Sequence, residues 1–186
     1  MTIKLPRTIR LDPSDTFIFD HLAEPGEWAV TGSFLFFDSD VAGLAGKARA
    51  AFRSGFLGVC SFGFSTLVVV GHASERERDE AIETLALQIN EKLGAPNIEA
   101  ARAAAGEEIA FAASLCRDEI NTIIAMHRTL EDGNLKEQFR TLRRRERAHA
   151  GADSLHASAR AFQFVETQDD PEERVDFGEL MRGAPS

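Results

Sequence analysis

The stretch FRSGFLGVCSFGFSTLVVV, from Phe52 to Val70, decides the fold because a predicted helix, a glycine-rich loop and a buried strand meet in it. The helix is expected to end at Gly55, since glycine suits the left-handed backbone of a helix stop. The loop over residues 55–65 carries three phenylalanines. The run 66–70 that follows is unbroken and rich in β-branched residues, as in a central strand. We therefore expect a sheet before this stretch and a core built around it.

Upstream of this stretch, turn-forming residues divide the chain into three predicted short strands. The strands are expected at residues 8–11, 16–19 and 28–37. The end of the third strand, residues 34–37, is too apolar for a half-exposed position. Either both of its faces are covered or the strand bends at Gly32.

Three helices are predicted from apolar residues that recur on one helical face. The first covers residues 41–52 and can be capped by Ser39 or Asp40. The second begins with a capping box, in which Ser74 is the N-cap and Glu77 stands three residues later. The third is an alanine-rich helix that starts after Asn97 and runs to about residue 116.

A tight hairpin is the most specific local prediction. Asp132-Gly133 is a type I′ turn signal between expected strands at residues 122–131 and 134–142. A two-residue turn fixes the register, so that Arg128 lies opposite Glu137 and Met126 lies opposite Phe139. These pairs share one face of the sheet. An opposed ion pair among apolar neighbours is either a salt bridge at the rim of the sheet or a partly buried one.

The predicted order is β-β-β-α-β-α-α-β-β followed by a C-terminal tail. Strands at both ends with helices between them favour an α+β fold, with a largely antiparallel sheet and about three helices packed on one face. We divide the chain into a body, residues 1–147, and an acidic tail, residues 148–186. The tail carries eight acidic and three basic residues.

Composition excludes several classes of function. The net charge is −9 and the one basic cluster, residues 140–147, is short, which argues against nucleic-acid binding. The sequence has no apolar run near the ~20 residues that span a bilayer. Two cysteines without a CxxC motif predict free thiols in a cytoplasmic protein, and residues 1–12 lack the apolar segment of a signal peptide. We expect no cofactor and no metal.

Weak ligand-binding candidates lie near the central stretch. Arg49, Arg53 and the Gly55 backbone suggest an anion pocket, but the C-terminal end of a helix dipole already favours cations. Cys60 in the glycine-rich loop needs a nearby base to act as a nucleophile, and His127 is one choice. Arg128 completes this set. Each of these residues also has an ordinary structural interpretation, as a packed thiol or a solvated charge.

The tail carries candidate interaction residues. Residues 161–165 alternate as in a short strand, and residues 176–182 carry the signals of a two-turn helix with an aspartate cap. Such a helix persists only when its apolar side is docked. We therefore expect the tail to dock on the body, on a second copy or on another protein; the alternative is a disordered acidic tail. The residues expected to dock are Phe162, Phe164, Phe177, Leu180 and Met181.

Residues of about 5–143 resemble a bacterial family of unknown function associated with alphaproteobacteria. The resemblance rests on the stretches LPRTIRLDPSDTF, AEPGEWAVTGSF, GKARAAFRSGFLG, STLVVV, EEIAFAASLC and AMHRTLEDG. It implies a bacterial, cytoplasmic domain and carries no catalytic residues with it.

Two hypotheses on function follow from these observations. The first is a non-catalytic accessory or protein-interaction protein that uses the body and its docking tail and has a protein partner or self-associates, for example as a homodimer. The second is a small enzyme or ligand-binding domain with a pocket at residues 55–65. A closed pocket of several hundred Å³ favours the second, and a flat apolar patch favours the first.

Overall fold

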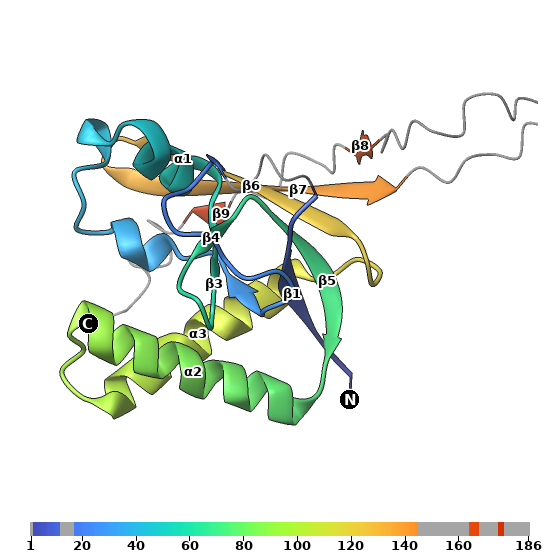
Figure 1. Ribbon diagram of the computed structural model, residues 1–186, viewed down its shortest axis with the longest axis horizontal. Coiled ribbons are helices and arrows are strands. Elements are labelled where there is room, and N and C mark those ends of the chain that lie inside the picture. The colour runs from blue at the N-terminus through green and yellow to red at the C-terminus, as the bar shows by residue number, and fades with distance from the viewer. Residues whose placement is uncertain (1, 12–16, 145–163, 168–174, 177–186) are drawn as a thin grey trace, which may run out of the picture.

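The computed structural model describes residues 2–11, 17–144, 164–167 and 175–176. It is an α+β fold with three α-helices and two antiparallel sheets (Figure 1). The large sheet has the order β1-β5-β6-β7-β8, and β9 also pairs with β7. Its strands are β1 (Ile3–Ile9), β5 (Leu67–Ala73), β6 (Ile123–Glu131), β7 (Asn134–Arg144), β8 (Phe164–Thr167) and β9 (Val175–Asp176).

The small sheet has the order β2-β3-β4 and forms the middle layer of the molecule. Its strands are β2 (Ala29–Val30), β3 (Phe56–Gly58) and β4 (Phe64–Ser65). Adjacent residues of β2 point to opposite sides: Ala29 packs with the large sheet, whereas Val30 packs with the helices. In β3, likewise, Phe56 packs with the large sheet and Leu57 packs with the helices. The residues predicted as a phenylalanine-rich loop therefore form a hairpin at the centre of the core.

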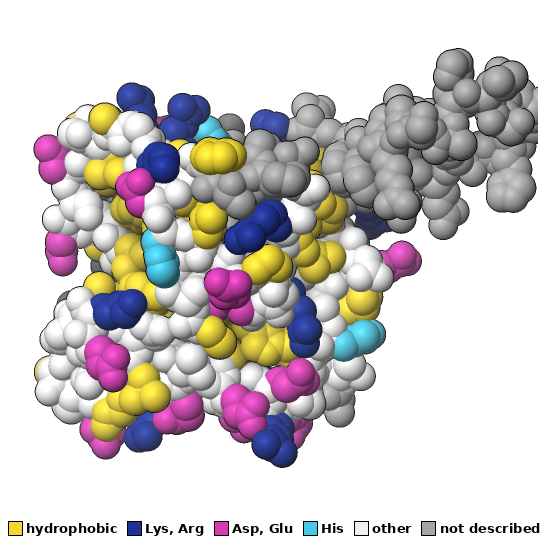
Figure 2. Space-filling view, viewed as in Figure 1, with side chains coloured by type: hydrophobic (Ala, Val, Ile, Leu, Met, Phe, Trp, Pro, Cys, Tyr) yellow, Lys and Arg dark blue, Asp and Glu magenta, His cyan; other side chains and the backbone are white. Residues whose placement is uncertain are grey.

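The second and third predicted helices are confirmed. They are α2 (Glu75–Leu93) and α3 (Ile98–Leu115), which pack side by side (Figure 1). The Ser74 capping box is complete, because Glu77 N donates to the Ser74 side chain and Ser74 N donates to the Glu77 carboxylate. The side of the molecule that carries α2 displays acidic and basic side chains interspersed (Figure 2).

The first predicted helix is shorter than expected. A 3₁₀-helix, Val41–Gly43, is capped by Asp40, and α1 (Gly46–Ser54) begins after a break. Gly55 has φ −87°, so the prediction of a left-handed helix stop was wrong; the chain instead continues extended into β3.

Two strand predictions near the N-terminus were wrong. Residues 17–19 form no strand, and residue 16 lies outside the described residues. The strand predicted over 28–37 ends after Val30, because Gly32 has φ 75° and turns the chain into a 3₁₀-helix, Ser33–Phe36. The bend at Gly32 was one of the two alternatives, and it removes the apolar residues 34–37 from the sheet. A side chain at this glycine would also meet Leu57 Cβ at 2.8 Å.

The hairpin prediction is confirmed in register. Arg128 lies opposite Glu137, and Met126 lies opposite Phe139. Asp132 and Gly133 have φ 51° and 79°, as a type I′ turn requires.

The large sheet has one face that packs against the rest of the molecule, which we call the inner face. Its side chains join Ala29, Phe56 and Cys116 in one core cluster; they are Val68, Val70, Ile124 and Met126. A second cluster joins α2 and α3 to the small sheet and to Leu5. The small sheet thus lies between the inner face and the helices α2 and α3.

The outer edge of β7 accepts two short strands from the C-terminal segment. β8 pairs with residues 141–144 of β7 and β9 pairs with residues 136–137, both antiparallel. The strand predicted in the tail therefore forms at Phe164, three residues later than expected. The other tail residues predicted to dock lie outside the described residues; they are Phe162, Phe177, Leu180 and Met181.

Candidate functional site

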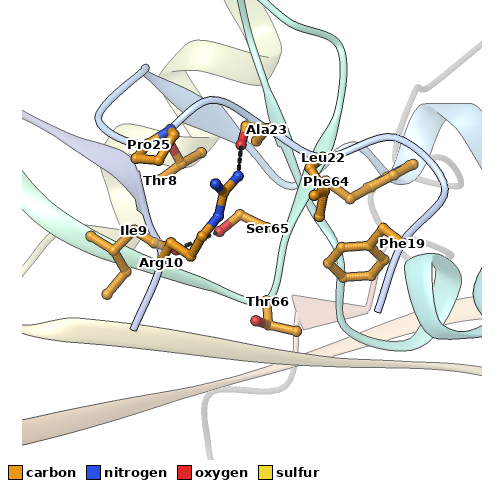
Figure 3. Close-up of a pocket in the computed structure, with 10 residues that line it drawn as sticks. All are labelled: Thr8, Ile9, Arg10, Phe19, Leu22, Ala23, Pro25, Phe64, Ser65 and Thr66. Atoms are coloured by element: carbon orange, nitrogen blue, oxygen red, sulfur yellow. Dashed lines mark hydrogen bonds between the residues drawn. The ribbon is translucent and has the colours of Figure 1, made fainter. Parts of the chain in front are cut away.

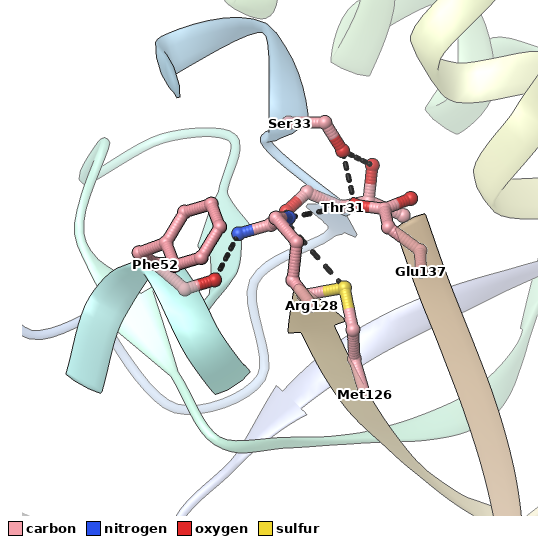
Figure 4. Close-up of polar contacts among 6 residues, drawn as sticks. All are labelled: Thr31, Ser33, Phe52, Met126, Arg128 and Glu137. Carbon is pink, nitrogen blue, oxygen red and sulfur yellow. Dashed lines mark hydrogen bonds and ion pairs between the residues drawn. The ribbon is translucent and has the colours of Figure 1, made fainter. Parts of the chain in front are cut away.

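The most unusual polar group in the described part of the chain is a buried ion pair. Arg128 on β6 and Glu137 on β7 are 0% and 1% exposed, and Arg128 Nε lies 2.8 Å from Glu137 Oε1. The pair lies on the inner face (Figure 4). The sequence allowed either a salt bridge at the rim of the sheet or a partly buried one. The structure shows that the pair is buried.

Besides its bond to Glu137, the Arg128 guanidinium donates to two segments that are distant in sequence (Figure 4). Nη1 donates to Phe52 O at 2.6 Å, and Nη2 donates to Thr31 O at 2.7 Å. Phe52 O lies at the end of α1, where the carbonyl groups carry the negative end of the helix dipole. The arginine thus ties α1 and the segment after β2 to the hairpin. The rings of Phe36 and Phe52 lie 5.2 and 5.8 Å from its guanidinium carbon.

The Glu137 carboxylate is satisfied on one oxygen only. Oε1 accepts from Arg128 and from the Ser33 hydroxyl, which also lies 3.2 Å from the Thr31 hydroxyl. Oε2 is buried and has no hydrogen-bond partner among the described residues. A buried charged oxygen without a partner is costly, so this oxygen offsets part of the stabilisation that the ion pair supplies.

A second carboxyl group lies near the pair. Burial, and then the Glu137 charge, raise the pKa of Glu108 on α3 to about 7, although Arg128 opposes the shift. Burial also lowers the pKa of Arg128, against the effect of Glu137. Glu108 was not predicted, although its position, seven residues after Ala101 and four before Ala112, places an acid on the buried stripe of the alanine-rich helix. This spacing from Ala101 and Ala112 is the sequence signal that could have identified Glu108.

We expect the stability of the chain to depend on pH through Glu108. Its pKa is 4.5 in its ordinary state and about 7 when folded, so between these values the folded chain holds a proton that the unfolded chain releases. The free energy of unfolding therefore falls as pH rises through this range, by up to about 3 kcal/mol. Glu108→Gln should remove this fall and stabilise the chain at pH 8, as measured by urea unfolding.

The control for this prediction is Glu107→Gln, because Glu107 is the exposed neighbour of Glu108 on the same helix. It should keep the pH dependence of the original chain. If the free energy of unfolding changes with pH in the same way for the original chain and for Glu108→Gln between pH 4.5 and 8, then Glu108 does not change its protonation on folding.

The other predicted ligand residues are not brought together. Arg49 and Arg53 are exposed on α1, Cys60 is exposed in the β3–β4 turn, and His127 is half-buried on the face of β6 opposite Arg128. Of the five, only Arg128 belongs to the buried polar group. No described group of three or more His, Cys, Asp or Glu side chains is placed to hold a metal ion.

The surroundings of Cys60 do not activate its thiol. The Glu27 carboxylate accepts hydrogen bonds from Cys60 N at 2.6 Å and Ser61 N at 2.9 Å. Burial, with the Glu27 charge, raises the pKa of Cys60 above its ordinary value. A nucleophilic thiol needs the opposite shift, which cationic neighbours produce.

We expect the two free thiols to differ sharply in reactivity. Cys116 is 4% exposed, and burial raises the pKa of its thiol to about 12, whereas Cys60 is exposed. Iodoacetamide should therefore modify Cys60 alone in the folded chain and both cysteines in denaturant, as read by mass spectrometry. Rapid modification of Cys116 without denaturant would contradict the buried position.

A hollow of about 270 Å³, including the part open to solvent, lies beside β4 (Figure 3). Phe64 and Ser65 line it, so it touches the end of the 55–65 segment. Arg10 points into it and donates to Ala23 O at 3.1 Å (Figure 3). None of Arg49, Arg53, Cys60, His127 and Arg128 lines this hollow. Only about 10 Å³ of this space is accessible to the centre of a water molecule, far less than the ~300–1,000 Å³ of typical ligand pockets.

The fold and this site define an α+β domain in which a buried Arg–Glu pair joins the large sheet to α1. The chain matches the model of a family of unknown function, DUF6505, over residues 2–160, and it belongs to that family. The resemblance at the sequence level to a family of unknown function is thus confirmed, and the match extends further than the expected 5–143. No curated protein and no solved structure matches the chain. None of the described helices is long and apolar enough to cross a membrane.

Proposed function

We propose that the chain is a non-catalytic protein-interaction protein that binds an extended segment of a partner at the outer edge of β7. The observation that carries the proposal is the antiparallel pairing of β8 and β9 along this edge. Strand addition at a sheet edge is a common mode of peptide binding, in which main-chain hydrogen bonds supply affinity. The chain's own segment 164–176 is then the occupant in cis, and a partner segment takes its place.

The described pairing covers two separate stretches of β7, which leaves room for a longer strand. β8 covers four residues of β7 and β9 covers two. Between these stretches β7 advances by three residues, 138–140, while the C-terminal segment advances by seven, 168–174. A continuous partner strand can pair with β7 beyond the six residues that β8 and β9 cover.

Charge indicates the kind of partner. β7 carries Lys136, Arg140, Arg143 and Arg144 against one acid, Glu137. Segment 164–176 carries six acids and one arginine. Opposite charges steer association and select partners, so we expect an acidic extended segment. A cytoplasmic location remains a prediction.

The test uses the full chain and a fluorescent peptide of residues 161–178. Val165→Pro with Val175→Pro weakens the cis segment, because proline lacks the N–H that pairs with β7. The peptide should bind this variant at least tenfold more tightly than the original chain, in which the tethered segment competes at ~mM effective concentration. Binding should weaken with salt and with an Asn/Gln version of the peptide.

The matched control is Gln168→Pro with Glu173→Pro, which alters two residues between the paired stretches and should leave peptide binding as in the original chain. Equal binding of a scrambled peptide, or no binding to the Val165→Pro, Val175→Pro variant, would refute strand addition at β7.

A further inference from the structure

The backbone groups of β7 point alternately toward β6 and toward the outer edge of the sheet. In a type I′ turn the two flanking residues, here Glu131 and Asn134, form a hydrogen-bonded pair. The β6–β7 register continues from this pair without a break, so the even-numbered residues of β7 bond to β6 and the odd-numbered ones face the edge. Glu137 and Phe139 are odd-numbered and lie on the inner face. A strand added at this edge therefore bonds through residues that take inner-face positions.

The two C-terminal strands pair through β-branched residues at these positions. β9 places Val175 opposite Glu137, and β8 places Val165 and Thr167 opposite two further odd-numbered residues of β7. Extended to Glu137, the register of β8 would bring Pro171 there, four residues before Val175. Because four is an even number, the odd-numbered residues of the C-terminal segment take inner-face positions in both registers.

Between β8 and β9 the odd-numbered residues suit this edge poorly. They are Asp169, Pro171 and Glu173. Extending the register of β9 would place Glu173 opposite Phe139, and extending that of β8 would place Asp169 there. In either register Pro171 falls at a position that bonds to the edge, and it has no N–H to donate. The chain's own segment therefore cannot supply a continuous strand that satisfies the whole edge.

The inner face beside Phe139 is apolar and already holds the buried Glu137 carboxylate. The centroid of the Phe139 ring lies 6.4 Å from that of Phe56 and 6.1 Å from that of Phe111. Glu137 is 1% exposed, and its Oε2 has no hydrogen-bond partner among the described residues. A carboxylate placed opposite Phe139 would lose water and add charge of the same sign, whereas a β-branched apolar side chain would pack against the ring.

We propose that the β7 edge selects its partner strand by alternate residues, with β-branched or other apolar residues, and no proline, opposite Glu137, Phe139 and Thr141. The segment 164–176 meets this requirement only at its two ends, so it acts as an incomplete competitor that a matching strand displaces. The inference rests on the function proposed above and names the chemistry of the partner. That partner is an extended segment in which apolar residues alternate with the acidic ones expected above.

The experiment measures the binding of fluorescent peptides to the proline variant used above, in which the cis segment is weakened. The parent peptide contains residues 161–178 with Pro171→Thr. Adding Glu173→Val, at an inner-face position, should increase affinity about tenfold, because an apolar side chain replaces a charge beside Phe139. The matched control adds Glu172→Val, which removes the same charge at the adjacent position on the opposite face. It should bind no more tightly than the parent peptide.

N-methylation tests the backbone register separately from the side chains. A methyl group on the amide nitrogen of residue 173 removes a hydrogen bond to the edge, so it should weaken binding of the Glu173→Val peptide about tenfold. The same group on residue 172 should change binding less than about twofold, because that N–H points away from β7.

Equal affinities of the Glu173→Val and Glu172→Val peptides, or equal losses from the two N-methyl groups, would overturn the selection by alternate residues and leave peptide binding at β7 intact. Absence of binding by every peptide, the parent included, would overturn the proposed function and this inference together. The two proposals thus fail in distinguishable ways.

Discussion

Glu137→Ala is expected to lower the free energy of unfolding by about 3–5 kcal/mol. The change leaves the Arg128 guanidinium, which is fully buried, without its paired carboxylate, and it removes the acceptor of the Ser33 hydroxyl. A buried charge that loses its partner retains the full cost of its desolvation. Urea unfolding at pH 7, followed by circular dichroism, measures the loss.

The matched control is Glu83→Ala, because Glu83 pairs with Arg102 at 2.8 Å, the same distance, with both side chains about half exposed. Its loss should stay below about 1 kcal/mol. Replacing the buried pair together, Arg128→Met with Glu137→Leu, should destabilise less than Glu137→Ala, since no buried charge remains. A loss below 1 kcal/mol for Glu137→Ala would show that the pair is not buried as described.

Gly63→Ala is the second change expected to have a large effect, with a loss of about 3 kcal/mol. A Cβ atom at this position would lie 2.3 Å from the backbone C and O of Leu22. The two segments cannot separate freely, because Phe64 N donates to His21 O and Ala23 N donates to Phe64 O, both at 2.9 Å. The melting temperature should fall by roughly 6–12 °C for a chain of this length.

Gly106→Ala serves as the control for Gly63→Ala. Gly106 lies inside α3, and a Cβ atom there would meet nothing within 4 Å. Alanine should therefore stabilise the helix by about 0.5–1 kcal/mol. Equal melting temperatures for Gly63→Ala and the original chain would contradict the close approach of the β3–β4 hairpin to Leu22.

Elements whose signals are local could be predicted from sequence. The Ser74 capping box joins residues three apart, and the Asp132-Gly133 turn joins adjacent strands. Each depends on interactions within a few residues, so it forms wherever the chain folds. The α+β class followed from the order of these elements, and the opposition of Arg128 and Glu137 followed from the turn alone.

Contacts between distant segments decided the rest. Residues 55–65 form a hairpin because Leu57 and Phe64 pair with Val30 and Leu22, far upstream. Arg128 lies in the core because its donors reach Thr31 and Phe52, 97 and 76 residues away. Local sequence carries no record of such partners, and burying a charge is favourable only when all of them are in place. The register of the hairpin thus came from the sequence, while the depth of its ion pair was decided by tertiary packing.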